Sequence, residues 1–252
     1  MRREILTILD ETERREGIRI LLAVESGSRA WGFASPDSDY DVRFIYVRPT
    51  RDYLRLRPVR DVIELPVTPV LDVNGWDLQK ALRLFDKSNP TVFEWLMSPL
   101  VYRETSFADR LRAAMAERFS QKKSMYHYLS MAEGNYRAYL RGDMVRAKKY
   151  FYVLRPLLAC QWILERGTPP PMRFAELAAA ELPAALRETV DALLAQKMRT
   201  AECGMIPRIP TLSAYLACGL VEMQARVGAM PDAPQASSAT LDALFLDALQ
   251  LL

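Results

Sequence analysis

The hydrophobic pattern of the chain changes from strand-like to helix-like along its length. Residues 18–24 form a short apolar run that is rich in strand formers. Residues 40–47 alternate between apolar or aromatic positions and polar ones, as a strand with one buried face does. Residues 2–16 have helical spacing. The pattern therefore predicts a helix followed by two strands, joined through a turn at SPDSD.

A second group of strands and helices follows in the next fifty residues. Residues 61–73 have the pattern of two strand pieces separated by prolines, and Asn74-Gly75 is typical of a tight turn. Apolar positions at helical spacing predict a helix over residues 76–88, and another begins near residue 91. The first 105 residues are therefore expected to form a β-sheet with helices.

After residue 106 the spacing is helical almost throughout. Helices are expected over residues 107–121, 125–140, 143–167, 173–180, 184–200 and 211–228. Asp143 would cap the third of these, and Pro156 would interrupt it. A small-residue spacer then leads to a short amphipathic helix, which must dock on the body or on a second copy of the chain. We therefore expect an α+β protein with a domain over residues 1–105, a helical domain over 106–228, and a spacer with a C-terminal helix over 229–252.

The composition limits the classes of protein to which the chain can belong. Half of its 252 residues are hydrophobic and 26% are charged, which is typical of a soluble globular protein. No apolar run approaches the roughly 18 residues of a membrane span, and the charged N-terminus lacks the apolar core of a signal peptide. We therefore expect a cytoplasmic protein with no membrane partner.

Cysteine, histidine and charge narrow the chemistry further. The three cysteines have no disulfide or zinc spacing, and the single histidine, His127, excludes a site built from several histidines. The net charge of +3 is small, but residues 118–155 hold nine basic and two acidic residues. That local excess predicts an anionic partner such as a nucleotide or RNA.

Two aspartates stand at the head of the alternating strand. Residues two apart on a strand point to the same side, so Asp39 and Asp41 share a face. Two close carboxylates repel each other unless a cation lies between them, and oxygen ligands suit magnesium. The pair therefore suggests a magnesium site that stays open to substrate phosphates. The structural alternative is a pair of ordinary turn and cap aspartates.

The turn before these aspartates fits the same hypothesis. Gly27 allows the backbone to approach a ligand closely, and Ser28 offers a hydroxyl and an N–H at the start of a short helical segment. Arg29 lies beside them. The alternatives are an ordinary turn serine and an arginine that pairs with a neighbouring acid. Trp31 and Phe33 are expected in the core rather than against a nucleobase.

Gly-Ser, a gap of ten residues and Asp-x-Asp at the head of an apolar strand together form a known signature. It is that of the DNA polymerase β-like nucleotidyltransferase superfamily, which this sequence resembles. The blocks GSRAWGFASPDSDYDVRFIYVRP, DVIELPV, LDVNGWDLQKALRLF, SNPTVFEWLMSPLVY and RAKKYFYVLRPLLACQWI are similar to those of the RNA-repair-pathway-associated (RlaP-like) nucleotidyltransferases, a bacterial branch. The resemblance covers about residues 18–165. It implies a nucleotidyltransferase-type mixed β-sheet with helices, followed by an all-helical domain.

The resemblance also implies a third catalytic carboxylate from a later strand. Glu64, Asp72 and Asp77 are the possibilities. Asp72 follows and precedes apolar residues, as a strand residue should, and is our choice. Asp77 is better placed to start the following helix, and Glu64 is the second choice. Asp39, Asp41 and Asp72 are thus expected to be both the catalytic residues and the metal ligands.

The helical half offers a basic and aromatic stripe. Spacings of four and three residues would align Arg141, Val145, Lys148, Tyr152 and Arg155 on one face of a long helix. We expect Lys148, Tyr152 and Arg155 to join Gly27, Ser28 and Arg29 in binding the nucleotide. A solvated helix face with ion pairs is the alternative.

Together these features predict a magnesium-dependent nucleotidyltransferase, with manganese as an alternative metal. It would transfer a nucleoside monophosphate from a nucleoside triphosphate to a hydroxyl group, and the resemblance suggests an RNA or tRNA end as acceptor. A different class of function is nucleotidylation of a protein or small molecule, as in toxin–antitoxin systems. A third is a non-catalytic nucleotide-binding regulator. A homo-oligomer could form through the C-terminal helix.

Overall fold

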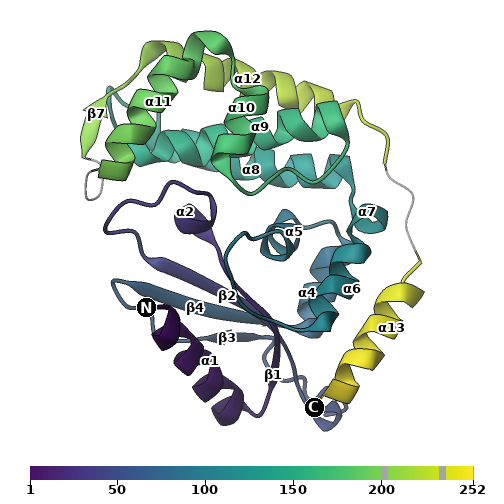
Figure 1. The fold of residues 1–252 in the computed structure, drawn as a ribbon. Coiled ribbons are helices and arrows are strands. Elements are labelled where there is room, and N and C mark those ends of the chain that lie inside the picture. Colours follow the sequence, from purple (N-terminus) through teal and green to yellow (C-terminus); the bar gives the residue numbers. More distant parts are fainter. Residues whose placement is uncertain (200–203, 233–236, 252) are drawn as a thin grey trace. The chain divides into compact units, whose positions relative to one another are not determined.

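The structure, a computed structural model, describes residues 1–199, 204–232 and 237–251 (Figure 1). The chain divides into two compact units. The first, called here the sheet unit, contains Met1–Ala30, Asp39–Arg118 and the C-terminal helix. The second, the helical unit, contains Trp31–Ser38 and the segment from Phe119 to the last long helix. The segment Trp31–Ser38 is therefore separated from its neighbours in the sequence and packs with the helices.

A mixed five-stranded sheet forms the centre of the first unit, with strand order β3-β4-β2-β1-β5. Its strands are β1 (Arg19–Glu25), β2 (Tyr40–Val47), β3 (Val62–Glu64), β4 (Leu71–Asp77) and β5 (Val101–Glu104). Strand β2 runs parallel to β4, and the other neighbouring pairs are antiparallel. Its helices are α1 (Arg2–Glu16), α2 (Gly27–Ala30), α3 (Thr50–Tyr53), α4 (Leu78–Asp86), α5 (Pro90–Leu96), α6 (Ser106–Ala113), α7 (Met115–Arg118) and α13 (Ala239–Ala248), followed by the 3-10 turn η1 (Leu249–Leu251). The expected α+β class is confirmed.

Strand β2 is buried because its apolar residues serve both faces of the sheet. Phe44 and Tyr46 pack with Ile5 and Leu9 of α1 on one face, as the alternating pattern predicts. Ile45 on the other face is also buried, and α4 contacts β2 and β4 there. The polar positions of the pattern are thus confined to the first half of the strand.

The tight turn predicted at Asn74-Gly75 is wrong, because both residues lie inside β4. Gly75 is opposite Phe44 in the parallel register. A Cβ atom at Gly75 would lie 2.1 Å from Cε2 of the Phe44 ring. The glycine is therefore required by close packing within the sheet, and no left-handed backbone conformation is involved.

The C-terminal helix α13 packs on its own chain. It contacts α4 and α6, the ring of Phe245 lies 5.0 Å from that of Tyr53, and Asp247 pairs with Arg110. The amphipathic pattern predicted that this helix docks either on the body of its own chain or on a second copy, and the structure shows the first. A homo-oligomer through this helix stays a prediction.

The helical unit is built around a long central helix. Its elements are α8 (Gln121–Tyr139), β6 (Met144–Arg146), α9 (Ala147–Arg166), α10 (Phe174–Glu181), α11 (Ala184–Arg199), β7 (Met205–Pro207) and α12 (Pro210–Gly228). Helix α9 packs against α8, α10 and α12 and is apolar on most sides, including its buried Pro156. Phe33 lies in the same core. The core assignment of Phe33 is therefore confirmed.

Two boundaries in the C-terminal half differ from the sequence prediction. The helix expected from Asp143 begins at Ala147, because Met144–Arg146 pairs with Met205–Pro207 in a two-stranded sheet. The compact units also differ from the segments 1–105 and 106–228. Helices α6 and α7 belong to the sheet unit, where the buried Arg118 pairs with Asp86.

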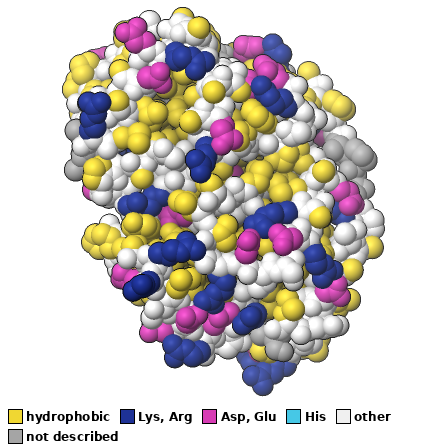
Figure 2. Space-filling view, viewed as in Figure 1, with side chains coloured by type: hydrophobic (Ala, Val, Ile, Leu, Met, Phe, Trp, Pro, Cys, Tyr) yellow, Lys and Arg dark blue, Asp and Glu magenta, His cyan; other side chains and the backbone are white. Residues whose placement is uncertain are grey.

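Surface charge is unevenly distributed on the viewed face. Dark-blue Lys and Arg side chains gather over the part of Figure 2 where the sheet unit lies, with magenta carboxylates between them.

Among the described helices, none is both long enough and apolar enough to cross a membrane.

Candidate active site

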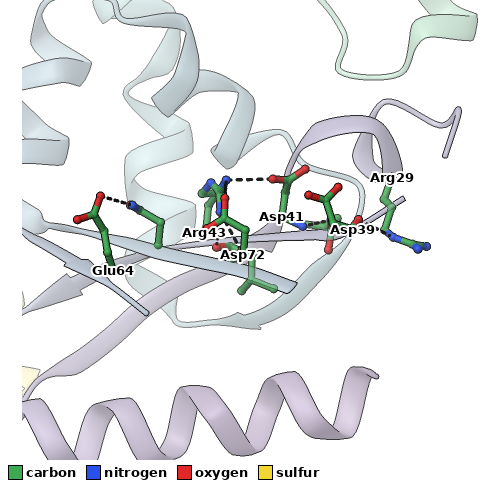
Figure 3. Close-up of polar contacts among 9 residues, drawn as sticks. Arg29, Asp39, Asp41, Arg43, Glu64 and Asp72 are labelled. Carbon is green, nitrogen blue, oxygen red and sulfur yellow. Dashed lines mark hydrogen bonds and ion pairs between the residues drawn. The ribbon is translucent and has the colours of Figure 1, made fainter. Parts of the chain in front are cut away.

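The parallel pairing of β2 with β4 brings two of the three predicted carboxylates together. Asp41 is directly opposite Asp72 in the register. The guanidinium of Arg43 lies between them: its Nη2 donates to Asp41 Oδ1 at 3.0 Å and to Asp72 Oδ2 at 2.7 Å (Figure 3). Its Nη1 donates to the backbone carbonyl of Asp72 at 3.0 Å. A positively charged group therefore bridges the two carboxylates.

Gly27 provides the space that the Asp41 carboxylate occupies. Its φ of +59° is left-handed, and a Cβ atom at this position would lie 2.0 Å from Asp41 Oδ2. Any other residue would therefore displace the carboxylate as well as strain the backbone. The Gly-Ser turn and the aspartate strand, separated by a dozen residues in the sequence, meet at this contact.

Glu25 lies beneath the site and was missed by the sequence analysis. It is fully buried; its Oε1 accepts from the backbone N–H of Asp41 at 2.8 Å, and its Oε2 accepts from the hydroxyl of Tyr102. Ser98 donates its hydroxyl to the Glu25 carbonyl at 2.6 Å. An acidic residue at the end of an otherwise apolar strand, directly before the Gly-Ser turn, was the available signal. Glu25, at the end of β1, thus links the backbone of Asp41 on β2 to Tyr102 on β5.

The electrostatics of the site favour added positive charge. Burial is the main cause that raises the pKa of Asp41, and the nearby Asp39 and Asp72 raise it further against the opposing effect of Arg43. Burial likewise raises the pKa of Glu25, with Asp41 adding to that effect. Carboxylates in such surroundings gain from a cation at short range.

The donor set fits a hard divalent cation by its chemistry. Asp41 and Asp72 present oxygen ligands within reach of one bridging group, and Gly27 allows the Asp41 carboxylate to lie against the turn. Arg43 now supplies the positive charge between them. Within the described ranges, no three acidic, histidine or cysteine side chains are already arranged around one point. A metal held by Asp41 and Asp72 would therefore require Arg43 to release at least one carboxylate.

The alternatives for the third carboxylate lie elsewhere. Glu64 is exposed on β3, where it pairs with Arg60 and accepts from Asn74 at 3.4 Å; Figure 3 shows it apart from Asp41. Asp77 ends β4 and caps α4 by accepting from the N–H of Gln79 at 2.8 Å. Of the three residues considered, only Asp72 lies beside Asp41.

The remaining predicted residues of the sheet unit lie in the turn after β1 and directly before β2. Asp39 is exposed and lies directly before β2. Its carbonyl accepts from Arg29 Nε at 2.9 Å, and the Arg29 guanidinium lies 3.6 Å from the centroid of the Tyr40 ring. Ser28 is the second residue of the short helix α2. Arg29 thus fastens the turn to the strand that carries the aspartates.

The stripe predicted in the helical half is wrong in part. Arg141 and Val145 lie outside helix α9, because β6 takes the place of its first turn. Arg155 is 2% exposed, with its guanidinium 4.7 Å from the Trp31 ring, and it donates to the carbonyl of Met172 at 3.4 Å. Its position is that of a core residue of the helical unit. Lys148 and Tyr152 are half-buried.

Comparison with known proteins assigns the chain to a family. The model of the RNA repair pathway DNA polymerase beta family, RlaP, matches residues 1–247. The chain is 48% identical over 219 residues to the uncharacterized protein YcgL of Bacillus subtilis (strain 168), an alignment that covers 86% of this chain and 84% of that protein. A solved structure of a nucleotidyltransferase-like protein from Exiguobacterium sibiricum 255-15 matches with 13% identity and a TM-score of 0.33, over 90% of this chain and 74% of that one. Because the family model spans nearly the whole chain, the protein belongs to the RlaP family, the RNA repair pathway DNA polymerase beta family.

Proposed function

We propose that this protein is a magnesium-dependent nucleotidyltransferase that transfers a nucleoside monophosphate from a nucleoside triphosphate to a hydroxyl group at an RNA end. The observation that carries the proposal is the pair Asp41 and Asp72, in register on adjacent parallel strands beside the Gly27 turn. Membership of the RlaP family supports the same chemistry and favours RNA as the acceptor.

Asp41 and Asp72 are the residues that would hold the metal, with Asp39 beside them at the head of β2. A bound divalent cation supplies charge neutralisation for the phosphates and lowers the pKa of a coordinated hydroxyl group. Without a metal, the positive charge of Arg43 offsets the repulsion between the two carboxylates. Glu25 holds the backbone of Asp41 in place through the N–H that it accepts.

The chain's own residues then have defined tasks. Gly27 and Ser28 bind the triphosphate through the backbone of the turn. The acceptor oxygen forms a bond to the α-phosphorus while the bond from that phosphorus to the pyrophosphate oxygen breaks. Asp72 takes the proton of the acceptor hydroxyl, and pyrophosphate leaves with its electron pair. Binding of the nucleotide by Lys148 and Tyr152 of the helical unit stays a prediction.

An acceptor screen tests the proposal. Purified protein is incubated with Mg²⁺ or Mn²⁺ and each of the four α-labelled triphosphates, together with RNA, tRNA or protein acceptors. We expect label on RNA, with pyrophosphate as the second product, and none in EDTA. Label on protein or a small molecule alone would replace RNA as the acceptor. Tight triphosphate binding without any transfer would instead support a regulatory nucleotide binder.

A further inference from the structure

A polar cavity lies at the other end of the strands that carry Asp41 and Asp72. It has a volume of about 470 Å³ and is lined by Arg48, Tyr53, Arg60, Asp77 and Arg83, among others. Arg48 follows the last residue of β2, and Asp77 is the last residue of β4. Since a strand rises about 3.3 Å per residue, this cavity is about 20 Å from the candidate active site.

Arg48 is a buried cation with unused hydrogen-bonding capacity. It is 7% exposed, and its Nε has no hydrogen-bond partner among the described residues. Its Nη2 donates only weakly to the hydroxyl of Tyr46, at 3.5 Å. A buried N–H without a partner is costly, so an anion in the cavity would satisfy a group that the protein leaves unsatisfied.

The carboxylates of the cavity are already engaged by other groups. Asp77 accepts from the Tyr53 hydroxyl at 2.9 Å and from Gln79 N–H, and Asp61 pairs with Lys80. The third carboxylate that lines the cavity, Asp52, pairs with Arg55 at 2.8 Å. Arg83, by contrast, donates only to the neutral side chain of Gln79, and no carboxylate in the described part of the chain pairs with it. The cationic side of the cavity is therefore the side that can accept a ligand.

The loop that follows β2 extends this positive surface outward. Residues 48–60 hold five arginines and one carboxylate, Asp52. Arg51 and Arg57 are exposed, and neither pairs with a carboxylate within the described residues. Leu54 is 79% exposed and Leu56 is fully exposed, so apolar side chains stand between the arginines. We call residues 48–60 the arginine loop.

We propose that the arginine loop and the cavity at Arg48 and Arg83 bind the phosphate backbone of a single RNA strand, about 20 Å from the reacting end. The identification of that RNA as the acceptor rests on the proposed function. A single small anion would use the cavity alone, whereas arginines spread along an exposed loop match phosphates that repeat along a polymer. The exposed leucines offer apolar contact to unstacked bases.

The test measures binding without catalysis. A fluorescein-labelled 20-nucleotide RNA is titrated with the full chain in EDTA, without triphosphate, at several salt concentrations. The loop variant carries Arg51→Gln, Arg55→Gln and Arg57→Gln, and the cavity variant carries Arg83→Gln. The matched control carries Arg3→Gln, Arg14→Gln and Arg15→Gln, which remove three exposed arginines from helix α1 of the same unit.

We expect the loop variant to weaken RNA binding about tenfold or more and to reduce the slope of log K against log salt by about 2, at roughly 0.7 per lost phosphate contact. The cavity variant should weaken binding severalfold, and the control less than twofold. Equal losses in the loop and control variants would overturn the proposal. So would loop-dependent binding to vesicles of phosphatidylglycerol in place of RNA, or displacement of the RNA by micromolar inorganic phosphate.

Because the binding assay contains neither Mg²⁺ nor triphosphate, its result does not depend on transfer. Loss of the loop effect overturns this inference, while absence of transfer to RNA overturns the proposed function.

Discussion

The two ends of the paired strands β2 and β4 carry opposite chemistry. At the first end, Asp41 and Asp72 face each other around a single arginine, Arg43. At the other end, Arg48 is buried with an unsatisfied N–H, and the neighbouring Asp77 is engaged by Tyr53 and Gln79. One pair of strands thus presents an acidic site that gains from a cation and, at the other end, a cavity in which the buried Arg48 gains from an anion. Parallel pairing is what separates them, because it collects like ends of the two strands.

The largest effect is expected from neutralising the acidic end. Asp41→Asn combined with Asp72→Asn should lower nucleotidyl transfer at least about 10³-fold, because roughly 4 kcal/mol of transition-state stabilisation is lost. The folded state should be kept, because the asparagine side chains still offer oxygen acceptors to Arg43, although the loss of both ion pairs should lower the free energy of unfolding. Steady-state transfer and circular dichroism measure the two effects. Glu64→Gln, on the same sheet but apart from the pair, is the control and should keep full activity.

The next effect tests the contact between the Gly-Ser turn and the aspartate strand. Gly27→Ala should destabilise the sheet unit by about 1–2 kcal/mol from its left-handed φ and by a further 1–3 kcal/mol from contact with Asp41. Gly17→Ala is the matched control, because its φ is +60° and nothing lies within 4 Å of the added Cβ. Thermal unfolding measures both. Equal destabilisation of the two variants would mean that Asp41 moves aside without cost.

A smaller effect is expected from removing the bridging cation. Arg43→Gln should destabilise the metal-free protein by about 1–3 kcal/mol, because two partly buried carboxylates then face each other without a partner. Mg²⁺ should restore more stability to this variant than to the wild type. Arg60→Gln removes an exposed pair with Glu64 and should cost less than about 1 kcal/mol. Unfolding in EDTA and in Mg²⁺ provides the comparison. A variant as stable as the wild type in EDTA would show that Arg43 does not serve as the internal cation.

The smallest effect concerns pH and the opposite end of the strands. Burial raises the pKa of Asp77, so the stability associated with its protonated form is present at low pH and is lost as pH rises through the raised pKa. Asp77→Asn keeps an acceptor for Gln79 N–H but removes the charge. The variant should therefore gain stability relative to the wild type as pH rises from about 4 to 7. Chemical denaturation across this range measures the difference, and a difference that does not vary with pH would contradict the raised pKa.

The sequence predicted most of the elements and the two carboxylates, Asp41 and Asp72, that the structure brings together. The alternating run of β2 and the helical spacing after residue 106 are strong periodic signals, and the structure confirms the α+β class that they indicate. Asp72 was singled out by its apolar neighbours, and the parallel register places it opposite Asp41. Long-range pairing decided the rest. Asn74-Gly75 has the composition of a turn, and only the packing of Phe44 against Gly75 shows why it lies in a strand.

Other residues could not be predicted because their roles depend on neighbours far away in the chain. Arg43 resembles any polar residue on the exposed face of a strand until β4 brings Asp72 beside it. The basic stripe expected on α9 lost its first members to the pairing of β6 with β7, which are separated by about sixty residues. Arginine is usually a surface residue, but Arg155 is buried and its guanidinium packs against the ring of Trp31 in the core of the helical unit.

The two-ended account is tested most directly by steady-state transfer to RNA with two variants measured side by side. Asp41→Asn should lower kcat while the Kd for RNA stays that of the wild type. The loop variant with Arg51→Gln, Arg55→Gln and Arg57→Gln should raise the KM for RNA about tenfold while kcat at saturating RNA is unchanged. The same parameter changing in both variants would contradict a division of catalysis and RNA binding between the two ends of β2 and β4.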